Sequence, residues 1–183
     1  MSYTVINGCE VDNTLQKDIT AKIKAFILKE KKQKNVNWIE LSDYNLKDCV
    51  ACDYCQATNP GLCTINDGQN DILRQYMASD TVVIITPIKF GCCNSLTKDF
   101  IDRTQSLALP YQVTKNGNTM MAARYKKYPS LFFIGINETS KEEYIESFKT
   151  FISGCNFAQL SQRCIVTTID THTDIDFLNH ILF

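Results

Sequence analysis

Residues 81–86 place the strongest constraint on the fold of this chain. Their sequence, TVVIIT, is apolar or β-branched at every position and far too short to cross a bilayer. A continuous run of this kind is typical of a strand buried on both faces, and such strands occur mainly in parallel sheets covered by helices. The segment therefore predicts the central strand of an α/β sheet.

Strand and helix patterns alternate along the rest of the chain. Apolar residues at helical spacing separate four further segments that are typical of strands, at residues 3–8, 36–41, 130–136 and 163–169. Parallel strands joined by helices imply a sheet that is covered on both faces. The sequence therefore predicts a doubly wound, three-layer α/β fold with five parallel strands in the order 2-1-3-4-5. The long connection at about 108–129 is expected to be a functional cover or a disordered loop.

The length and composition of the chain fit a single domain. Its 183 residues, of which 44% are apolar, are enough for one well-packed core and few for two. We therefore expect residues 1–183 to form one domain with a cysteine-rich loop at about 45–66. The net charge of −1 gives no field that would attract nucleic acid. The first residues lack a signal-peptide pattern, so we expect a cytoplasmic protein that is not bound to a membrane.

The segment CVACDYCQATNPGLC, residues 49–63, holds four of the nine cysteines. A reducing compartment favours metal binding or catalysis by such thiols over structural disulfides. Iron-sulfur clusters use short Cys-x2-Cys-x2-Cys runs with a more distant Cys that closes the site. Structural zinc sites usually use two separated Cys-x2-Cys pairs, which leaves the third Cys without a role. Disulfides, zinc, an iron-sulfur cluster and unpartnered thiols are the four alternatives. The candidate ligands are Cys49, Cys52, Cys55 and Cys63.

The predicted topology places a ligand site at one edge of the sheet. Ligands of doubly wound sheets bind beyond the carboxyl ends of the strands, where the winding reverses. For this strand order the loops at that edge are residues 8–14, 87–95 and 135–140. The cysteine-rich loop leaves the same edge after the second strand. We therefore expect the thiols and the ligand on one side of the molecule.

Three segments, taken together, resemble a known family. They are INGCEVDNTL, CVACDYCQATNPGLCTINDG and SDTVVIITPIKFGCCNSLTKDFIDR. In this order and spacing they resemble the flavodoxin-like NAD(P)H-dependent FMN reductases, and especially their iron-sulfur flavoprotein branch. The resemblance covers roughly the first 105 residues. It implies a flavodoxin-like fold, an FMN cofactor and a [4Fe-4S] cluster whose ligands are Cys49, Cys52, Cys55 and Cys63.

The resemblance also implies where the FMN phosphate binds. In the family, the loop after the first strand holds the phosphate at the start of the following helix, where free N–H groups and the helix dipole attract an anion. Gly8, Asn13 and Thr14 match that loop, and Cys9 stands where the family has Ser.

The loop departs from the family pattern in its charge. The family's Arg is missing, and Glu10 and Asp12 introduce negative charge near the place of a dianion. At about 4 Å and an effective dielectric of about 20, each like-charge pair would cost on the order of 4 kcal/mol if the carboxylate faced the phosphate.

The loop after the third strand is expected to wrap the flavin ring. Thr-Pro-Ile-Lys-Phe-Gly takes the place of the family's Ser-Pro-Val-Tyr-Phe-Gly, so Lys89 replaces a Tyr and either faces the ring or points to water. Asn137 and Glu138 belong to the third loop by position alone. The candidate FMN-binding residues are Cys9, Asn13, Thr14, Pro87, Ile88, Lys89, Phe90, Gly91 and Asn137.

Several other residues near these motifs are assigned structural roles. Asp67 is expected to cap the helix that follows it. Lys98, Asp102 and Arg103 match the end of a family helix and are expected to form a buried or interface ion pair.

The remaining cysteines and histidines near or beyond the motifs are also interpreted as structural. Cys92 and Cys93 precede a helix, where a thiol is either reactive or, more often, a small buried hydrophobe. His172 and His180 lie in the carboxyl-terminal tail, away from every motif.

These patterns lead to two hypotheses about function. The first is an FMN-dependent oxidoreductase that passes electrons from NAD(P)H or ferredoxin to a small acceptor, with or without a cluster. The second is a flavodoxin-fold protein that has lost FMN and uses its thiols for metal binding or redox sensing. The resemblance further implies a homodimer or homotetramer. No residue pattern identifies a catalytic side chain.

Overall fold

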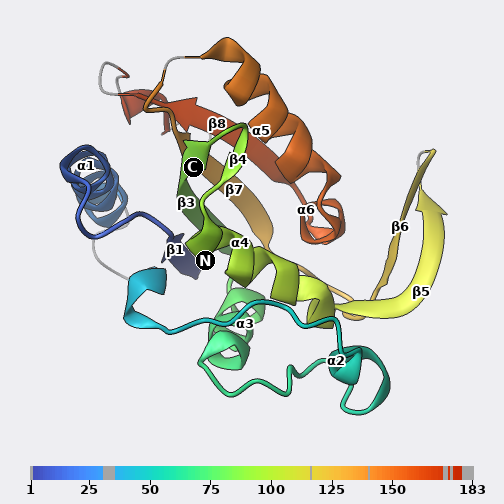
Figure 1. The fold of residues 1–183 in the computed structure, drawn as a ribbon. Coiled ribbons are helices and arrows are strands. Elements are labelled where there is room, and N and C mark those ends of the chain that lie inside the picture. The colour runs from blue at the N-terminus through green and yellow to red at the C-terminus, as the bar shows by residue number, and fades with distance from the viewer. Residues whose placement is uncertain are drawn as a thin grey trace.

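A five-stranded parallel sheet forms the centre of the molecule (Figure 1). The computed structural model describes residues 2–30, 36–115, 117–139, 141–170, 173 and 175–178. The sheet has the order β2-β1-β3-β7-β8, which confirms the predicted order 2-1-3-4-5. Its strands are β1 (Tyr3–Asn7), β2 (Val36–Glu40), β3 (Thr81–Lys89), β7 (Ser130–Ile136) and β8 (Cys164–Ile169).

Helices cover both faces of the sheet, as the alternation of strand side chains requires. Ile23 and Phe26 of α1 (Thr14–Glu30) pack with Val83 of β3 on one face. On the other face Val82 packs with Phe100 and with residues of the remaining long helices. The elements of this second face are α3 (Gln69–Ala78), α4 (Ser95–Asp102), α5 (Glu142–Gly154) and the short α6 (Asn156–Leu160). The strand β3 is buried along almost its whole length, as its apolar sequence predicts.

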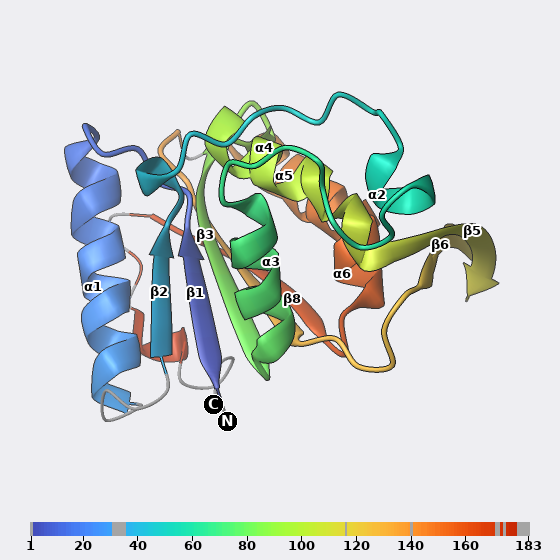
Figure 2. The same cartoon turned by 90° about the horizontal axis from the view of Figure 1, so that it is seen from below.

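The connection at about 108–129, expected to be a functional cover or a disordered loop, is largely ordered. It contains an antiparallel hairpin, β5 (Ala108–Lys115) and β6 (Asn118–Ala123), which projects from the body of the molecule (Figures 1 and 2). Gly117 turns the chain between the strands with a φ of +78°. Tyr111 and Val113 alternate with polar residues, which is typical of a strand, although both side chains are exposed. The length of the connection alone does not reveal that pattern.

The helix after residue 94 also ends earlier than its apolar spacing suggests. The α-helix stops at Asp102, and a 3-10 segment, η2 (Arg103–Leu107), carries Leu107 into the core. Among the described residues no helix has the length and apolar character needed to cross a membrane. His172 and His180 lie outside the described residues.

Candidate functional site

The cysteine-rich loop runs across α4 on the side of the molecule where the parallel strands end (Figure 2). It follows η1 (Leu41–Asp43) and contains the one-turn helix α2 (Tyr54–Ala57). Cys49 and Cys52 are exposed, whereas Cys55 and Cys63 are half-buried. All four thiols line one pocket, which Arg103 helps to close.

The four thiols are also electrostatic neighbours. Burial raises the pKa of Cys55, and the nearby thiols of Cys63, Cys49 and Cys52 raise it further. In the part of the chain that the structure describes, however, no three Cys, His, Asp or Glu side chains converge closely enough to hold a metal ion. Four thiols are the kind of donor set that an iron-sulfur cluster uses.

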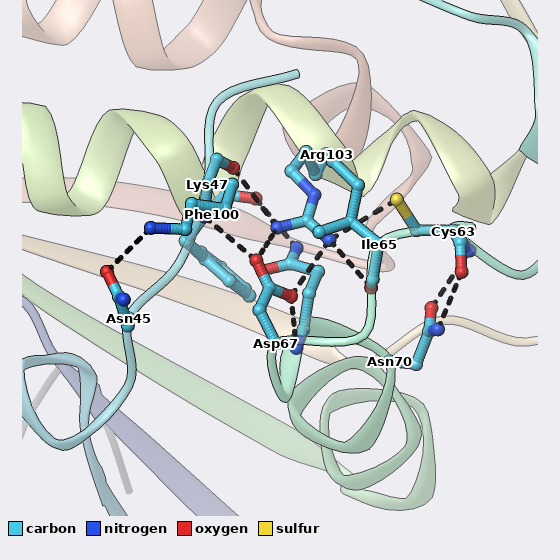
Figure 3. Close-up of polar contacts among 9 residues, drawn as sticks. Asn45, Lys47, Cys63, Ile65, Asp67, Asn70, Phe100 and Arg103 are labelled. Carbon is cyan, nitrogen blue, oxygen red and sulfur yellow. Dashed lines mark hydrogen bonds and ion pairs between the residues drawn. The ribbon is translucent and has the colours of Figure 1, made fainter. Parts of the chain in front are cut away.

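A buried ion pair connects Asp67, at the end of this loop, to Arg103, which directly follows α4. The guanidinium of Arg103 contacts Asp67 through Nη1 and, at 3.0 Å, through Nη2, and the two side chains are 1% and 7% exposed. Nη2 also donates to the Sγ of Cys63 at 3.2 Å (Figure 3). Arg103 therefore forms the predicted buried ion pair, but its partner is Asp67. Lys98 and Asp102 pair with each other near the surface.

Asp67 does not sit at the cap position that we predicted. Gly68 occupies it, and α3 begins at Gln69, whose N–H still donates to Asp67 at 3.3 Å. Burial by itself would raise the pKa of Asp67, but hydrogen bonds from Arg103 and from the backbone N–H groups of Lys47 and Gln69 outweigh it and hold the pKa below its ordinary value. The carboxylate of Asp67 therefore links the loop at Lys47, the first residue of α3 and Arg103.

The loop after β1 packs closely against the start of α4. Asn94 caps α4 by accepting the N–H of Thr97 at 3.1 Å, and its side-chain amide donates to the carbonyl of Gly8 at 2.8 Å. A Cβ at Gly8 would lie 2.0 Å from the Oγ1 of Thr97 and 3.3 Å from the carbonyl of Ile85. Glycine is therefore the residue that this close approach of backbone to helix permits.

Replacing Gly8 with alanine is expected to destabilise the fold by about 1–3 kcal/mol, because the new methyl group overpacks a filled site. Urea unfolding of the single variant and of Gly8→Ala/Thr97→Ala measures the effect. The double variant should recover part of the loss, since the hydroxyl that meets the methyl is gone. A single variant as stable as the natural chain would contradict the contact.

Cys9 and Asn13, two of the predicted phosphate residues, have other contacts in this structure. Cys9 is buried beneath the loop, and burial raises the pKa of its thiol to about 12 even though Thr20 donates to its sulfur. Asn13 caps α1 by accepting the N–H of Gln16 at 3.1 Å. Its side-chain amide donates to Glu138 at 2.8 Å.

Glu138, in the loop after β7, is the centre of the predicted phosphate region. Its Oε1 accepts from Asn13 and, at 2.7 Å, from Gln16, while Oε2 accepts from Lys89 at 2.7 Å. Burial opposes ionisation of Glu138, but hydrogen bonds from Lys89, Gln16 and Asn13 hold its pKa below the ordinary value. Glu10 and Asp12, the acidic residues that the sequence brought into question, are exposed. The donors bind an anion, and in this structure that anion is a carboxylate of the chain itself.

The predicted ring loop is a tight β-hairpin. Pro87, Ile88 and Lys89 end β3, and Lys89 pairs with Cys92 of β4 (Cys92–Cys93). Phe90 and Gly91 form the turn with φ values of +51° and +78°, as a type I′ turn requires. The Phe90 side chain is 88% exposed and meets Tyr144 of α5 edge to face at 6.2 Å. A bulky residue held with positive φ presents its ring outward at the edge where ligands bind.

The structure brings most of the predicted residues to one side of the molecule. Lys89 has a partly exposed side chain and pairs with Glu138. Asn137 is buried, and its Oδ1 accepts the N–H of Thr139. Cys93 is also buried, and burial raises the pKa of its thiol, which favours the interpretation of Cys93 as a small buried hydrophobe. Sequence reasoning missed the role of Gln16, whose spacing from Asn13 on the first helical turn was the available signal.

Solved flavoprotein structures share this fold. An azoreductase from Bacillus anthracis superposes with a TM-score of 0.63 at 11% identity, covering 100% of this chain and 93% of its own. An FMN-dependent NADH-azoreductase from the same species, in complex with FMN, superposes with a TM-score of 0.59 at 17% identity and covers 93% and 87%. At such identities the likeness concerns the fold alone.

Sequence comparison gives the family. An iron-sulfur flavoprotein of Archaeoglobus fulgidus is 36% identical over 67 residues, which are 37% of this chain and 32% of that protein. One of Methanocaldococcus jannaschii is 29% identical over 76 residues, or 42% and 38%. The matched part of the chain spans about a third of the length of these relatives. The model of the family described as NADPH-dependent FMN reductase matches residues 1–125. This chain belongs to the NADPH-dependent FMN reductase family.

Proposed function

We propose that the protein is an FMN-dependent oxidoreductase that passes electrons from a nicotinamide donor to a small acceptor. Family membership over residues 1–125 supports this, together with the arrangement of the three edge loops. The observation that most directly supports the proposal concerns an anion at that edge, the carboxylate of Glu138. The side chains of Asn13, Gln16 and Lys89 all donate hydrogen bonds to it. Such donors would bind the phosphate of FMN once the carboxylate of Glu138 moves away from them.

The side chains of the β3–β4 hairpin would hold the other end of the cofactor. Bound FMN supplies the redox chemistry by accepting electrons from a donor and giving them to an acceptor. Phe90 offers an exposed aromatic face beside the ring position, and Gly91 lets the backbone approach closely. Lys89 would be freed from Glu138 and would place its charge near the phosphate or the ring.

We further propose that Cys49, Cys52, Cys55 and Cys63 bind a [4Fe-4S] cluster. The four thiols line one pocket, and the two curated relatives are named iron-sulfur flavoproteins. A bound cluster transfers single electrons, which a flavin can accept or give. The protein's part is to hold the sulfurs together and to shield Cys63 from water beside Arg103.

The donor and the acceptor are further parts of the proposal. The family description favours NADPH as donor, and ferredoxin is the alternative if the cluster is present. The names of the structural neighbours favour azo compounds or quinones as acceptors. We propose that the protein works in the cytoplasm as a homodimer or homotetramer.

Anaerobic purification followed by an absorption spectrum, an iron assay and NADPH oxidation tests the proposal. We expect two flavin bands after FMN is added, about four irons per chain by the chemistry of the cluster, and NADPH consumption that depends on a quinone. A colourless protein that binds no added FMN would instead support the second candidate, a thiol or metal-binding protein. That result would mean that Glu138 keeps the three donors engaged and excludes the phosphate.

A further inference from the structure

The buried guanidinium of Arg103 lies directly against a sulfur of the cysteine pocket. We propose that Arg103 is a positioning residue that places Cys63 and raises the reduction potential of a cluster bound there. The inference rests on the cluster part of the proposed function. The observation behind it is the donation from Nη2 to the Sγ of Cys63 at 3.2 Å by a side chain that is 1% exposed.

Arg103 has a fixed orientation at this position. Nη1 donates to the carbonyl of Lys47 at 3.1 Å, and Nη2 donates to that of Ile65 at 3.3 Å (Figure 3). The carboxylate of Asp67 accepts hydrogen bonds from both of these nitrogens. The guanidinium therefore cannot turn away from Cys63 without breaking several hydrogen bonds. A lysine at this position could turn away more easily, because its ammonium group lacks the rigid planar fork of arginine.

Cys63 is held from a second direction as well. The side chain of Asn70 in α3 accepts the N–H of Cys63 and donates to its carbonyl, both at 2.9 Å. The backbone of Cys63 is thus fixed by α3 and its sulfur by Arg103. The place of Cys63 is therefore set by contacts to both its backbone and its sulfur.

The charge of Arg103 acts in a definite direction. An arginine stays protonated at any relevant pH, and a cluster with four thiolates becomes more negative when it is reduced. An N–H donated to a ligand sulfur and a positive charge beside it stabilise the reduced form more than the oxidised form. Asp67 balances the charge of Arg103, but the guanidinium is the group that contacts the sulfur. The Nε of Arg103, buried and without a partner among the described residues, remains a further donor in the same pocket wall.

The test compares midpoint potentials of the anaerobically reconstituted full chain, measured by redox titration with EPR detection. The variant Arg103→Met/Asp67→Asn removes both charges, so no unpaired charge is left buried. Arg103→Lys keeps the charge but loses the fork. Lys98→Gln is the matched control, because it removes a positive charge from α4, the helix that precedes Arg103, at a partly exposed pair with no contact to Cys63. Circular dichroism and iron content are recorded for every variant.

We expect the double variant to disfavour reduction at least tenfold, which is about 59 mV for one electron. Arg103→Lys should give a smaller shift in the same direction, and Lys98→Gln should stay within twofold of the natural chain. Equal potentials in the natural chain and a fully loaded double variant would overturn the inference while the proposed function stands. A natural chain that assembles no cluster would overturn the inference together with the cluster proposal. If the double variant folds but does not hold iron, the potential of Arg103→Lys decides the question.

Discussion

Replacing Asp67 with asparagine is expected to lower the free energy of unfolding at pH 7 by about 3–5 kcal/mol. The substitution leaves the guanidinium of Arg103 buried without its counter-charge, and it weakens the hydrogen bonds from the Lys47 and Gln69 N–H groups. A buried charge without a partner is among the costlier defects that one substitution can produce. Urea unfolding at pH 7 measures the loss.

The same pair predicts a pH dependence. The pKa of Asp67 is lower in the folded protein than its ordinary value of 3.8, so its contribution is fully present above about pH 4 and is lost as the pH falls through the lower folded value. The natural chain should therefore lose more stability between pH 5 and pH 3 than Asp67→Asn does. Asp102→Asn, which breaks the surface pair with Lys98, is the control and should change stability by about 1 kcal/mol or less. Equal losses for the two variants would contradict the importance of the buried pair.

Replacing Glu138 with glutamine is expected to tighten FMN binding at least tenfold, or about 1.4 kcal/mol. The carboxylate engages the three side-chain donors that we assign to the phosphate, and its charge repels a dianion. Riboflavin has no phosphate, so its dissociation constant should change by less than about threefold. Quenching of flavin fluorescence gives both constants at fixed ionic strength, since salt screens the repulsion.

Glu143→Gln is the matched control for Glu138→Gln. Glu143 is an exposed carboxylate in the first turn of α5, and its removal changes the net charge by the same amount. It should leave the ratio of FMN to riboflavin affinity unchanged. If Glu138→Gln also leaves that ratio unchanged, the carboxylate does not compete with the phosphate. If neither flavin binds to the natural chain or to the variant, the proposed function itself is wrong.

Local patterns were sufficient to predict the sheet. The run at residues 81–86 predicted β3, and β7 spans residues 130–136 as its apolar pattern indicated. These segments are buried on both faces, so their sequence carries the fold directly. Local patterns do not predict the hairpin at residues 108–123, because its strands form a separate two-stranded sheet in which residues 111–114 are exposed.

The contacts of the candidate site depend on long-range packing, which local patterns do not encode. Spacing along a helix favours Arg103 as a partner of its own helix, yet it pairs with Asp67, which is 36 positions away in the sequence. Glu138 was recognised as a member of the third loop, but its bonds to Asn13 and Gln16 join segments more than 120 positions apart. Predicting those contacts requires the loop conformations that the assembled sheet imposes.

The length of α4 determines the distance between the two proposed cofactor sites. Asn94 at its beginning holds the carbonyl of Gly8, and Arg103 just past its end holds the sulfur of Cys63. An eight-residue helix is about 12 Å long, so the spacing of the flavin edge and the thiol pocket is set by the number of residues between these anchors. Insertion of one residue would lengthen this spacing by about 1.5 Å and rotate Arg103 by about 100° away from the pocket. If both cofactors bind as proposed, the distance that an electron crosses between them therefore depends on the length of this one helix.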